Sequence, residues 1–333
     1  MARRALGPAA LAVVQAVEQV ASGSLLVACS GGADSLALAA AARVVGGRRG
    51  LSVRAVVVDH GLQPGSDEVA ARVVRQLAQG VAESPMTAIR PQLAPMEATV
   101  VAVRVEAAGE GVEAAARLAR YRALESAARG DELILLGHTL DDQAETVLLG
   151  LARGSGTRSL AGMPARRGPF VRPLLGLRRV TTRAACAEFG LEPWEDPHNE
   201  SLGFARARVR HRVLPVLEAE LGPGIAEALA RTAALARADA DLLDELAAQA
   251  RLNQPSGSLD VSSLTDLPDA IRRRVLRTWL TEAGARDLSA AHLHAVDALL
   301  TDWHGQGPLA LPGVRVERRG GLLHVVSPLR DQR

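Results

Sequence analysis

The sequence contains no lysine, so arginine supplies all 39 of its Lys and Arg residues. This absence excludes the Walker A nucleotide-binding loop, which requires a lysine after its glycines. It also excludes reactions in which a lysine of the protein supplies an amine, so amine chemistry would take its amine from a substrate. Aromatic residues make up only 2% of the chain, which leaves few side chains for stacking on nucleic-acid bases. The candidates for stacking are Tyr121, Phe170, Trp194 and Phe204.

Cysteine occurs only twice, as Cys29 and Cys186, and the two residues are far apart in the sequence. A zinc ribbon, a cysteine-ligated cluster or a disulfide framework would need closely spaced pairs, so these classes of site are excluded. We expect both thiols to be small buried residues.

Long apolar runs are also missing, and no stretch approaches the roughly 20 apolar residues of a membrane span. The first 20 residues combine a basic start with apolar residues, as a signal peptide does, but Gln15 and Glu18 interrupt them. Their apolar residues recur at helical spacing, which predicts an amphipathic helix. We therefore expect a cytoplasmic protein without a membrane segment.

The length of 333 residues, 48% of them hydrophobic, is that of a globular protein with room for two domains. A formal net charge of +2 does not by itself indicate a nucleic-acid binder. We predict a first domain over 1–218 and a second, mostly helical domain over 219–333 that ends in a small β-hairpin.

Strand-like and helix-like patterns alternate in the first domain. Strands are predicted at 24–29, 53–58, 99–105 and 132–136, and helices at 33–44, 66–79, 113–128, 139–152 and 180–189. Repeated βα units with apolar strands predict an α/β fold with a doubly wound, mainly parallel sheet. In the second domain, helices are predicted near 225–250, 267–283 and 289–303, and a hairpin over 308–327.

Polar residues gather directly after three of the predicted strands. The groups are SGGADS at 30–35, Asp59-His60-Gly61 and Gly137-His138-Thr139. In a doubly wound sheet, ligands bind outside the carboxyl ends of the strands at the topological switch point. The three groups therefore predict an active site at one edge of the sheet.

The group at 30–35 suits a phosphate. Gly31 and Gly32 allow a tight turn, and backbone N–H groups through Ala33 at a helix N-terminus form an anion nest, to which the hydroxyls of Ser30 and Ser35 can add. Asp34 would repel phosphate directly, so a Mg²⁺ ion between them is its natural role. A plain glycine-rich turn with a serine cap is the alternative, whereas a serine nucleophile fits poorly because G-x-S-x-G is absent.

Two helical segments carry further candidates. In GVEAAARLARY (111–121), Glu113, Arg117 and Arg120 lie on one helix face. This face is either a solvated surface with an i,i+4 ion pair or a row of guanidinium groups that binds phosphates. In the next segment, Thr139 and Asp142 form a capping pattern, which explains one acid at most. Capping does not explain why a histidine and three acids occur together. These residues suit proton transfer or Mg²⁺ binding and are His138, Asp141, Asp142 and Glu145.

In chain order the sequence carries SGGADS, DHGL, EAAARLARY, GHTLDDQAET, LARGSG, RPLL and EDPHN. The first motif resembles the PP-loop of the ATP-pyrophosphatase superfamily, whose members cut ATP between the α and β phosphates. Together, over about residues 24–218, the motifs resemble the tRNA(Ile)-lysidine synthase family. The resemblance implies that ATP adenylates C2 of the wobble cytidine in a tRNA(Ile) with a CAU anticodon, and that the ε-amine of free L-lysine displaces AMP.

The resemblance also implies that 1–218 is the ATP-binding catalytic domain with the PP-loop, that 219–333 binds tRNA, and that the candidate residues have the following roles. The ATP phosphates would be bound by Ser30, Gly31, Gly32, Ala33, Asp34 and Ser35 with Asp59 and His60, and Asp34 would help to place Mg²⁺. Arg117 and Arg120 would neutralise adenylate or RNA phosphate. Cytidine or the incoming ammonium would be held by His138, Asp141, Asp142 and Glu145.

Four arginine clusters are either RNA contacts or solvated helix faces. They are Arg166-Arg167, Arg178-Arg179, the run from Arg206 to Arg212, and Arg272-Arg273-Arg274. Rival functions are another PP-loop enzyme, such as a tRNA thiolase or an amidotransferase-type synthetase, or a non-catalytic nucleotide- or RNA-binding regulator. Thiolases usually need paired cysteines, which this sequence lacks. A homodimer is left open.

Overall fold

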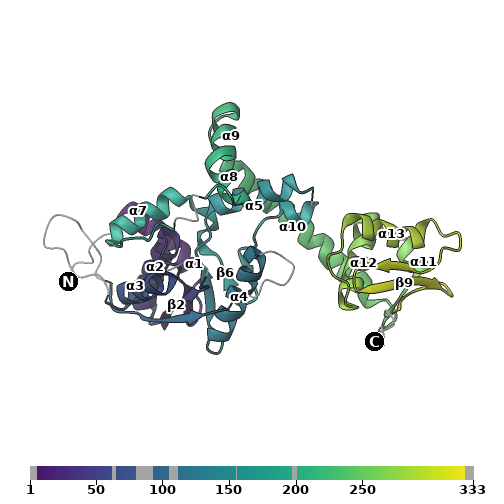
Figure 1. Cartoon of the computed structure of the whole chain (residues 1–333), viewed down its shortest axis with the longest axis horizontal. Coiled ribbons are helices and arrows are strands. Elements are labelled where there is room, and N and C mark those ends of the chain that lie inside the picture. Colours follow the sequence, from purple (N-terminus) through teal and green to yellow (C-terminus); the bar gives the residue numbers. More distant parts are fainter. Residues whose placement is uncertain are drawn as a thin grey trace. The chain divides into compact units, whose positions relative to one another are not determined.

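The computed structural model describes residues 6–61, 65–79, 93–104, 112–154, 156–196 and 201–326, with the backbone alone at 112–114. It contains two compact units (Figure 1). The first comprises Met1–Gly154 and Gly162–Ala233, and the second comprises Ser155–Ala161 and Ala234–Arg333. The assignment of catalysis to 1–218 and of tRNA binding to 219–333 remains a prediction.

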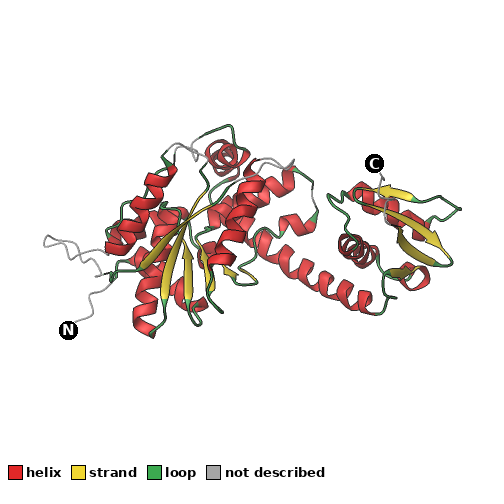
Figure 2. Ribbon diagram, turned by 60° about the horizontal axis from the view of Figure 1, so that its bottom comes forward, coloured by secondary structure: helices red, strands yellow, loops and turns green. Residues whose placement is uncertain are grey.

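The first unit is built on a six-stranded sheet with helices on its two faces (Figure 2). The strands are β1 (Leu25–Ala28), β2 (Val53–Asp59), β3 (Glu97–Ala102), β4 (Leu133–Leu136), β5 (Arg166–Arg167) and β6 (Phe170–Val171). Their order is β3-β2-β1-β4-β6-β5, and all neighbours are parallel except β5 and β6. The chain leaves β1 in one direction and returns to its other side with β4, so the switch point lies between the carboxyl ends of β1 and β4.

The first unit contains the helices α1 (Pro8–Val20), α2 (Ala33–Arg49), α3 (Ser66–Gln79), α4 (Val112–Ala127), α5 (Leu140–Ala152), α7 (Arg179–Phe189), α8 (Ala205–Arg208) and α9 (Leu214–Leu221), with a π-helical turn at Val209–Val213. Apolar residues of α5 and α9 form a cluster of their own with the start of α10 (Ile225–Leu252). One core includes residues of α1, α2, α3 and α7, and a second includes Leu124 and Tyr121 of α4. The predicted N-terminal helix is confirmed, because α1 buries Ala10, Val13, Val14 and Val17.

The second unit packs helices on one face of a four-stranded antiparallel sheet. It contains most of α10 (Ile225–Leu252), then α11 (Val261–Thr265), α12 (Asp269–Glu282) and α13 (Ala290–Thr301). Its strands are β7 (Ser258–Asp260), β8 (Leu309–Leu311), β9 (Val314–Arg319) and β10 (Leu322–Val326), in the order β7-β10-β9-β8. The predicted hairpin is therefore confirmed as β9 and β10, but it forms the centre of a larger sheet.

The predicted α/β class, the mainly parallel sheet and the second helical unit are all confirmed. Within the described ranges, every helix is too short or too polar to cross a lipid bilayer.

Candidate active site

The turn at 30–35 joins β1 to α2 and is closed by its own side chains. Gly31 has a left-handed φ of +87°, and a Cβ there would lie 2.4 Å from Cγ2 of Val73, so only glycine fits. The Ser35 hydroxyl donates to the Gly32 carbonyl at 3.0 Å and accepts from the Ser30 N–H at 3.1 Å. Gly32 is the N-cap of α2 and offers no side-chain cap, so the N–H groups of the first turn can serve an anion.

Asp34 lies in the first turn of α2 and is largely buried. Its carboxylate accepts a hydrogen bond from the Thr182 hydroxyl and lies 3.7 Å from Nε of Arg179. Burial raises the pKa of Asp34 to about 6, although the Thr182 hydrogen bond opposes the shift. The carboxylate therefore remains ionised near pH 7 and can act as a ligand of a cation.

The residues after β2 form a second turn at the same edge of the sheet. The Asp59 carboxylate accepts from the Gly61 N–H at 3.0 Å and so is used to fix the turn. Arg120 of α4 donates from Nε to Nε2 of His60 at 3.3 Å. Burial and the Arg120 charge lower the pKa of His60, so its imidazole is neutral and its proton is on Nδ1. That buried Nδ1 has no hydrogen-bond partner, so it is open to a ligand.

The turn after β4 packs directly on the first turn. A Cβ on Gly137 would lie 3.2 Å from the backbone of Asp34 and Ser35, so glycine allows the two turns to touch. The Thr139 N–H donates to the Asp142 carboxylate at 2.8 Å, and the Thr139 hydroxyl accepts from the Asp142 N–H at 3.4 Å. This capping box begins α5 and uses one oxygen of Asp142.

The acidic residues of α5 meet guanidinium groups that the sequence analysis did not assign to them. Glu145 is fully buried and lies 2.8 Å from Nε of Arg210 and 3.3 Å from Nη1 of Arg179. Asp142 accepts from Nη2 of Arg179 at 2.7 Å. Arg179 thus links Glu145 and Asp142 to Asp34, and an incoming ammonium would have to displace it.

Asp141 is held in a similar way on the outer side of α5. It lies 3.1 Å from Nη2 of Arg178 and accepts from the Arg179 N–H at 2.7 Å. Nη1 of Arg178 is 2.5 Å from Glu227 at the start of α10. Asp141 therefore serves the start of α7, and its charge acts on Arg179 together with those of Asp142 and Glu145.

His138 stands between β4 and α5 with its Nδ1 buried and without a hydrogen-bond partner. Burial holds the pKa of His138 far below its ordinary value, and Arg172 and Arg117 lower it further, whereas Asp142 opposes the shift. The imidazole is therefore neutral and keeps one unsatisfied nitrogen for a ligand.

Arg117 and Arg120 leave α4 toward different partners. Nη2 of Arg117 donates to the Tyr121 hydroxyl at 3.2 Å, and Nη2 of Arg172 donates to the same hydroxyl at 2.9 Å. The Tyr121 ring lies edge-on to Phe170 with 4.7 Å between ring centroids. Phe170 is buried, so the predicted base stacking on Phe170 is wrong, whereas stacking on Tyr121 remains a prediction. The side chain of Glu113 lies outside the described residues.

Both cysteines are buried next to the phosphate turn, as expected. Cys29 Sγ lies 3.7 Å from the Ser35 hydroxyl, and Cys186 donates to the Ala33 carbonyl at 3.1 Å. Burial raises the pKa of both thiols, that of Cys186 to about 12. They are packing residues and not nucleophiles.

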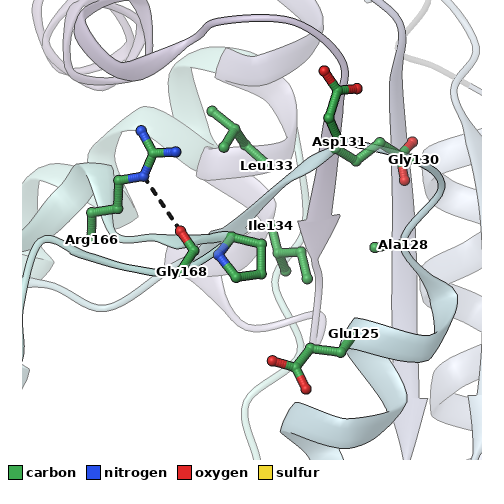
Figure 3. Close-up of a pocket in the computed structure, with 10 residues that line it drawn as sticks. Glu125, Ala128, Gly130, Asp131, Leu133, Ile134, Arg166 and Gly168 are labelled. Atoms are coloured by element: carbon green, nitrogen blue, oxygen red, sulfur yellow. Dashed lines mark hydrogen bonds between the residues drawn. The ribbon is translucent and has the colours of Figure 1, made fainter.

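The Trp194 N–H donates to the Gly31 carbonyl at 2.9 Å, which ties the loop after α7 to the phosphate turn. The last residues of the EDPHN motif, 197–199, lie outside the described part of the chain. A pocket at the other edge of the sheet, where β4 begins, is lined by Glu125, Asp131 and Arg166 and contains none of the predicted site residues (Figure 3).

Comparison with known proteins identifies the family. A family model described as a PP-loop domain matches residues 8–217, and one described as the TilS substrate binding domain matches 259–324. The tRNA(Ile)-lysidine synthase of Leifsonia xyli subsp. xyli (strain CTCB07) is 55% identical over 313 residues, which are 91% of this chain and 90% of that relative. The chain belongs to the tRNA(Ile)-lysidine synthase family.

A second member of the tRNA(Ile)-lysidine synthase family, from Rhodococcus erythropolis (strain PR4 / NBRC 100887), is 52% identical over 308 residues, 90% of this chain and 89% of its own. The solved structure of the U34-tRNA thiolase NcsA from Methanococcus maripaludis with its 4Fe-4S cluster matches with a TM-score of 0.52 and 16% identity. That match covers 68% of this chain and 77% of the thiolase and shows a shared fold alone. Membership in the family makes this protein a ligase that uses ATP.

Sequence reasoning found the three turns but missed Arg179, Arg210 and Thr182 as parts of the site. Arg206 also turns inward, with Nε 3.9 Å from Glu145 and Nη2 donating to the Thr146 hydroxyl at 3.3 Å. One signal was present, because the i,i+4 spacing of Arg206 and Arg210 places both on one helix face.

Proposed function

We propose that this protein joins free L-lysine to C2 of the wobble cytidine of a tRNA(Ile) with a CAU anticodon, with ATP converted to AMP and pyrophosphate. The carrying observation is the uncapped N-terminus of α2 behind the Gly31 turn, in contact with the Gly137 turn at the switch point of the sheet. The family membership and the names of its relatives support the tRNA substrate and the lysidine product.

The first step would take place at the phosphate turn. Backbone N–H groups of 31–35 would bind the ATP phosphates, and Nδ1 of His60 offers one further donor. The described residues contain no cluster of three or more His, Cys, Asp or Glu that could hold a metal by themselves. A single carboxylate, Asp34, fits Mg²⁺, which usually keeps water and substrate phosphates as its other ligands. When bound, Mg²⁺ would neutralise charge on the phosphates.

The second step would join the amine to the base. The lysine ε-nitrogen attacks C2, the bond from C2 to the oxygen carrying AMP breaks, AMP leaves with that oxygen, and the nitrogen loses a proton. We assign a hydrogen-bond acceptor role toward the attacking amine to His138, because its lowered pKa makes it a weak base but leaves it neutral with an open buried nitrogen. Glu145 and Asp142 act as positioning residues for Arg179 and Arg210, which would face developing phosphate charge.

The direct test incubates the full chain with ATP, Mg²⁺, radiolabelled lysine and a tRNA(Ile) transcript that has a CAU anticodon. We expect label in the RNA and one AMP released per lysine joined. A transcript with a UAU anticodon lacks the wobble cytidine and controls for specificity. Absence of label from the CAU transcript would overturn the proposal.

A cytoplasmic location follows from the proposed substrates, since ATP, free lysine and tRNA are cytoplasmic molecules. Fractionation of cells that express the tagged chain tests it, and recovery with the membrane or outside the cell would contradict it. A homodimer remains a prediction, which sedimentation of the purified chain can decide.

A further inference from the structure

An exposed tryptophan marks one end of the small sheet in the second unit. Trp303 follows α13 and is 37% exposed, although the sequence has only three Trp residues. A second Trp of this unit, Trp279, is 2% exposed and lies in its core. The exposure of Trp303 is therefore not explained by the packing of the unit.

An arginine holds the indole from one side. The guanidinium carbon of Arg318, in β9, lies 5.3 Å from the ring centroid of Trp303. The same guanidinium donates to the Leu299 carbonyl at 2.9 Å and to the Leu300 carbonyl at 3.4 Å, near the C-terminus of α13. Because the helix end fixes Arg318, the ring that rests on it has a defined position.

The loop around Trp303 is ordered by its own hydrogen bonds. The Gln306 side chain accepts from the His304 N–H at 2.9 Å and donates to the Asp302 carbonyl at 2.6 Å. Nδ1 of His304 lies 3.1 Å from the same carbonyl. A loop that is already ordered loses little conformational entropy when a ligand binds.

Basic residues lie at the same end of the sheet. β8 pairs antiparallel with β9, with Leu309 opposite Val316, so the loop that precedes β8 runs beside the end of β9. That end carries Arg318, whose neighbours Glu317 and Arg319 point to the opposite face of the sheet because side chains alternate along a strand. We call Trp303, His304 and Arg318 the Trp303 patch; the exposed Asp302 is the acidic residue next to it in sequence.

We infer that the Trp303 patch binds an unpaired nucleotide of the tRNA substrate, with the base stacked on the face of Trp303 that Arg318 leaves open. Proteins hold single-stranded bases by stacking them on aromatic rings, and arginine adds a cation–π contribution. The patch lies in the stretch 259–324 that matches a substrate binding domain. The inference rests on the proposed function, since that function supplies RNA as the occupant.

Binding of a tRNA(Ile) transcript to full-length variants tests the patch. Trp303→Leu should weaken the Kd about 5- to 150-fold, which is the usual range for loss of one stacked base, and Trp303→Phe should restore much of it. Leu252→Ala, at an 84% exposed apolar residue of the same unit, is the matched control and should bind as the wild type does. Equal affinities of the wild type and Trp303→Leu, with both chains folded by circular dichroism, would overturn the inference.

Fluorescence provides a readout that a merely structural role of Trp303 would not move. In a Trp194→Phe background the emission comes from buried Trp279 and exposed Trp303, and tRNA should quench the latter. Trp303→Phe in that background should remove the quench, and an RNA duplex without unpaired bases should quench far less than tRNA. Equal quenching by duplex and tRNA contradicts stacking.

The two proposals can fail separately. If the wild type makes no lysidine, the proposed function is wrong. If it makes lysidine but tRNA binding does not depend on Trp303, only this inference is wrong.

Discussion

Two arginine-rich runs, 206–212 and 272–274, look alike in the sequence but are used differently in the structure. In the first unit, Nε of Arg210 lies 2.8 Å from Glu145, one helical turn beyond the capping box of α5. In the second unit, Nε of Arg272 lies 2.6 Å from Asp297, and both side chains are buried between α12 and α13. Both arginines pair with a buried carboxylate, but Arg272 is itself buried whereas Arg210 is partly exposed.

The difference lies in what surrounds each pair. The Glu145 pair is next to the phosphate turn, where Arg179 connects it to Asp34. The Arg272 pair is surrounded by the apolar core of the second unit. We therefore expect changes near Glu145 to affect the reaction and changes at Arg272 to affect stability. The expectation of RNA contact by Arg272 is wrong, because the residue is buried.

Asp34→Asn tests the reaction side of this comparison and should have the largest effect. The amide keeps the size of the side chain but loses the charge that would hold Mg²⁺, so lysine joining should fall more than about 100-fold. Radiolabelled lysine incorporation and AMP release measure it. Thermal unfolding should show no loss of stability. Burial raises the pKa of Asp34, which means that keeping its carboxylate charged costs free energy in the folded state. Normal turnover by this variant would show that the phosphate turn has been assigned wrongly.

Arg272→Ala tests the stability side. It leaves Asp297 buried without its main partner, which should lower the free energy of unfolding of the second unit by about 3–5 kcal/mol. Urea unfolding followed by circular dichroism measures the loss. The double variant Arg272→Met with Asp297→Leu removes both charges and should regain most of the stability. A single variant as stable as the wild type would mean that the pair does not support the fold.

Glu145→Gln asks whether an ion pair near the phosphate turn serves the reaction. The change is nearly isosteric but weakens the hold on Arg210 and Arg179, and misplaced arginines should lower kcat/KM about 10- to 100-fold. The exposed Glu125→Gln is the matched control and should leave kcat/KM unchanged. If Glu145→Gln lowered the free energy of unfolding without changing kcat/KM, the ion pairs of Glu145 would serve only stability, as the pair of Arg272 and Asp297 does.

Much of the fold could be predicted because apolar periodicity is strong in its longer elements. Helix α3 has the predicted bounds, 66–79, whereas α2 continues to Arg49 and not to 44. The glycines at 46 and 47 read as helix breakers, but Gly46 is needed for packing, since a Cβ there would lie 2.5 Å from Val53. Strands of two or three residues, such as β5 and β7, give too short a pattern to detect.

The candidate site was predictable only in its local parts. The turns at 30–35, 59–61 and 137–139 can be recognised because Gly, Ser, Asp, His and Thr follow directly after apolar strands. The partners of the acids come from afar, since Arg179 lies 34 residues beyond Glu145 and Thr182 lies 148 beyond Asp34. Such pairs depend on how α7 packs on α1 and α2, and no local pattern encodes that packing. Trp303 was missed because exposure is a property of the folded unit.

Thr182→Val tests whether the pKa of Asp34 sets the pH dependence of the reaction. Wild-type activity should fall as the pH drops through about 6, because protonated Asp34 cannot hold a cation. Loss of the Thr182 hydrogen bond to the carboxylate should raise the pKa, and so move this acid limb up by about one to two pH units. Because the pKa of Asp34 is about 6 in the folded state and 3.8 ordinarily, protonation of Asp34 between these pH values favours the folded state. Acid unfolding driven by Asp34 therefore does not explain the loss of activity below pH 6. An unmoved limb would assign it to another group.

Arg274→Ala should have the smallest effect and bears on the second unit alone. Nε of Arg274 lies 2.8 Å from Asp244, and Nη1 donates to the Ala270 carbonyl at 2.8 Å. Because its donors are engaged within the unit, its loss should change the tRNA Kd less than about twofold and leave the salt dependence of binding unchanged. Trp303→Leu, in the Trp303 patch, should instead weaken binding at every salt concentration, because stacking releases no counterion. Titrations at several salt concentrations compare the two, and a reduced slope for Arg274→Ala would mean that the ion pair opens to admit a phosphate.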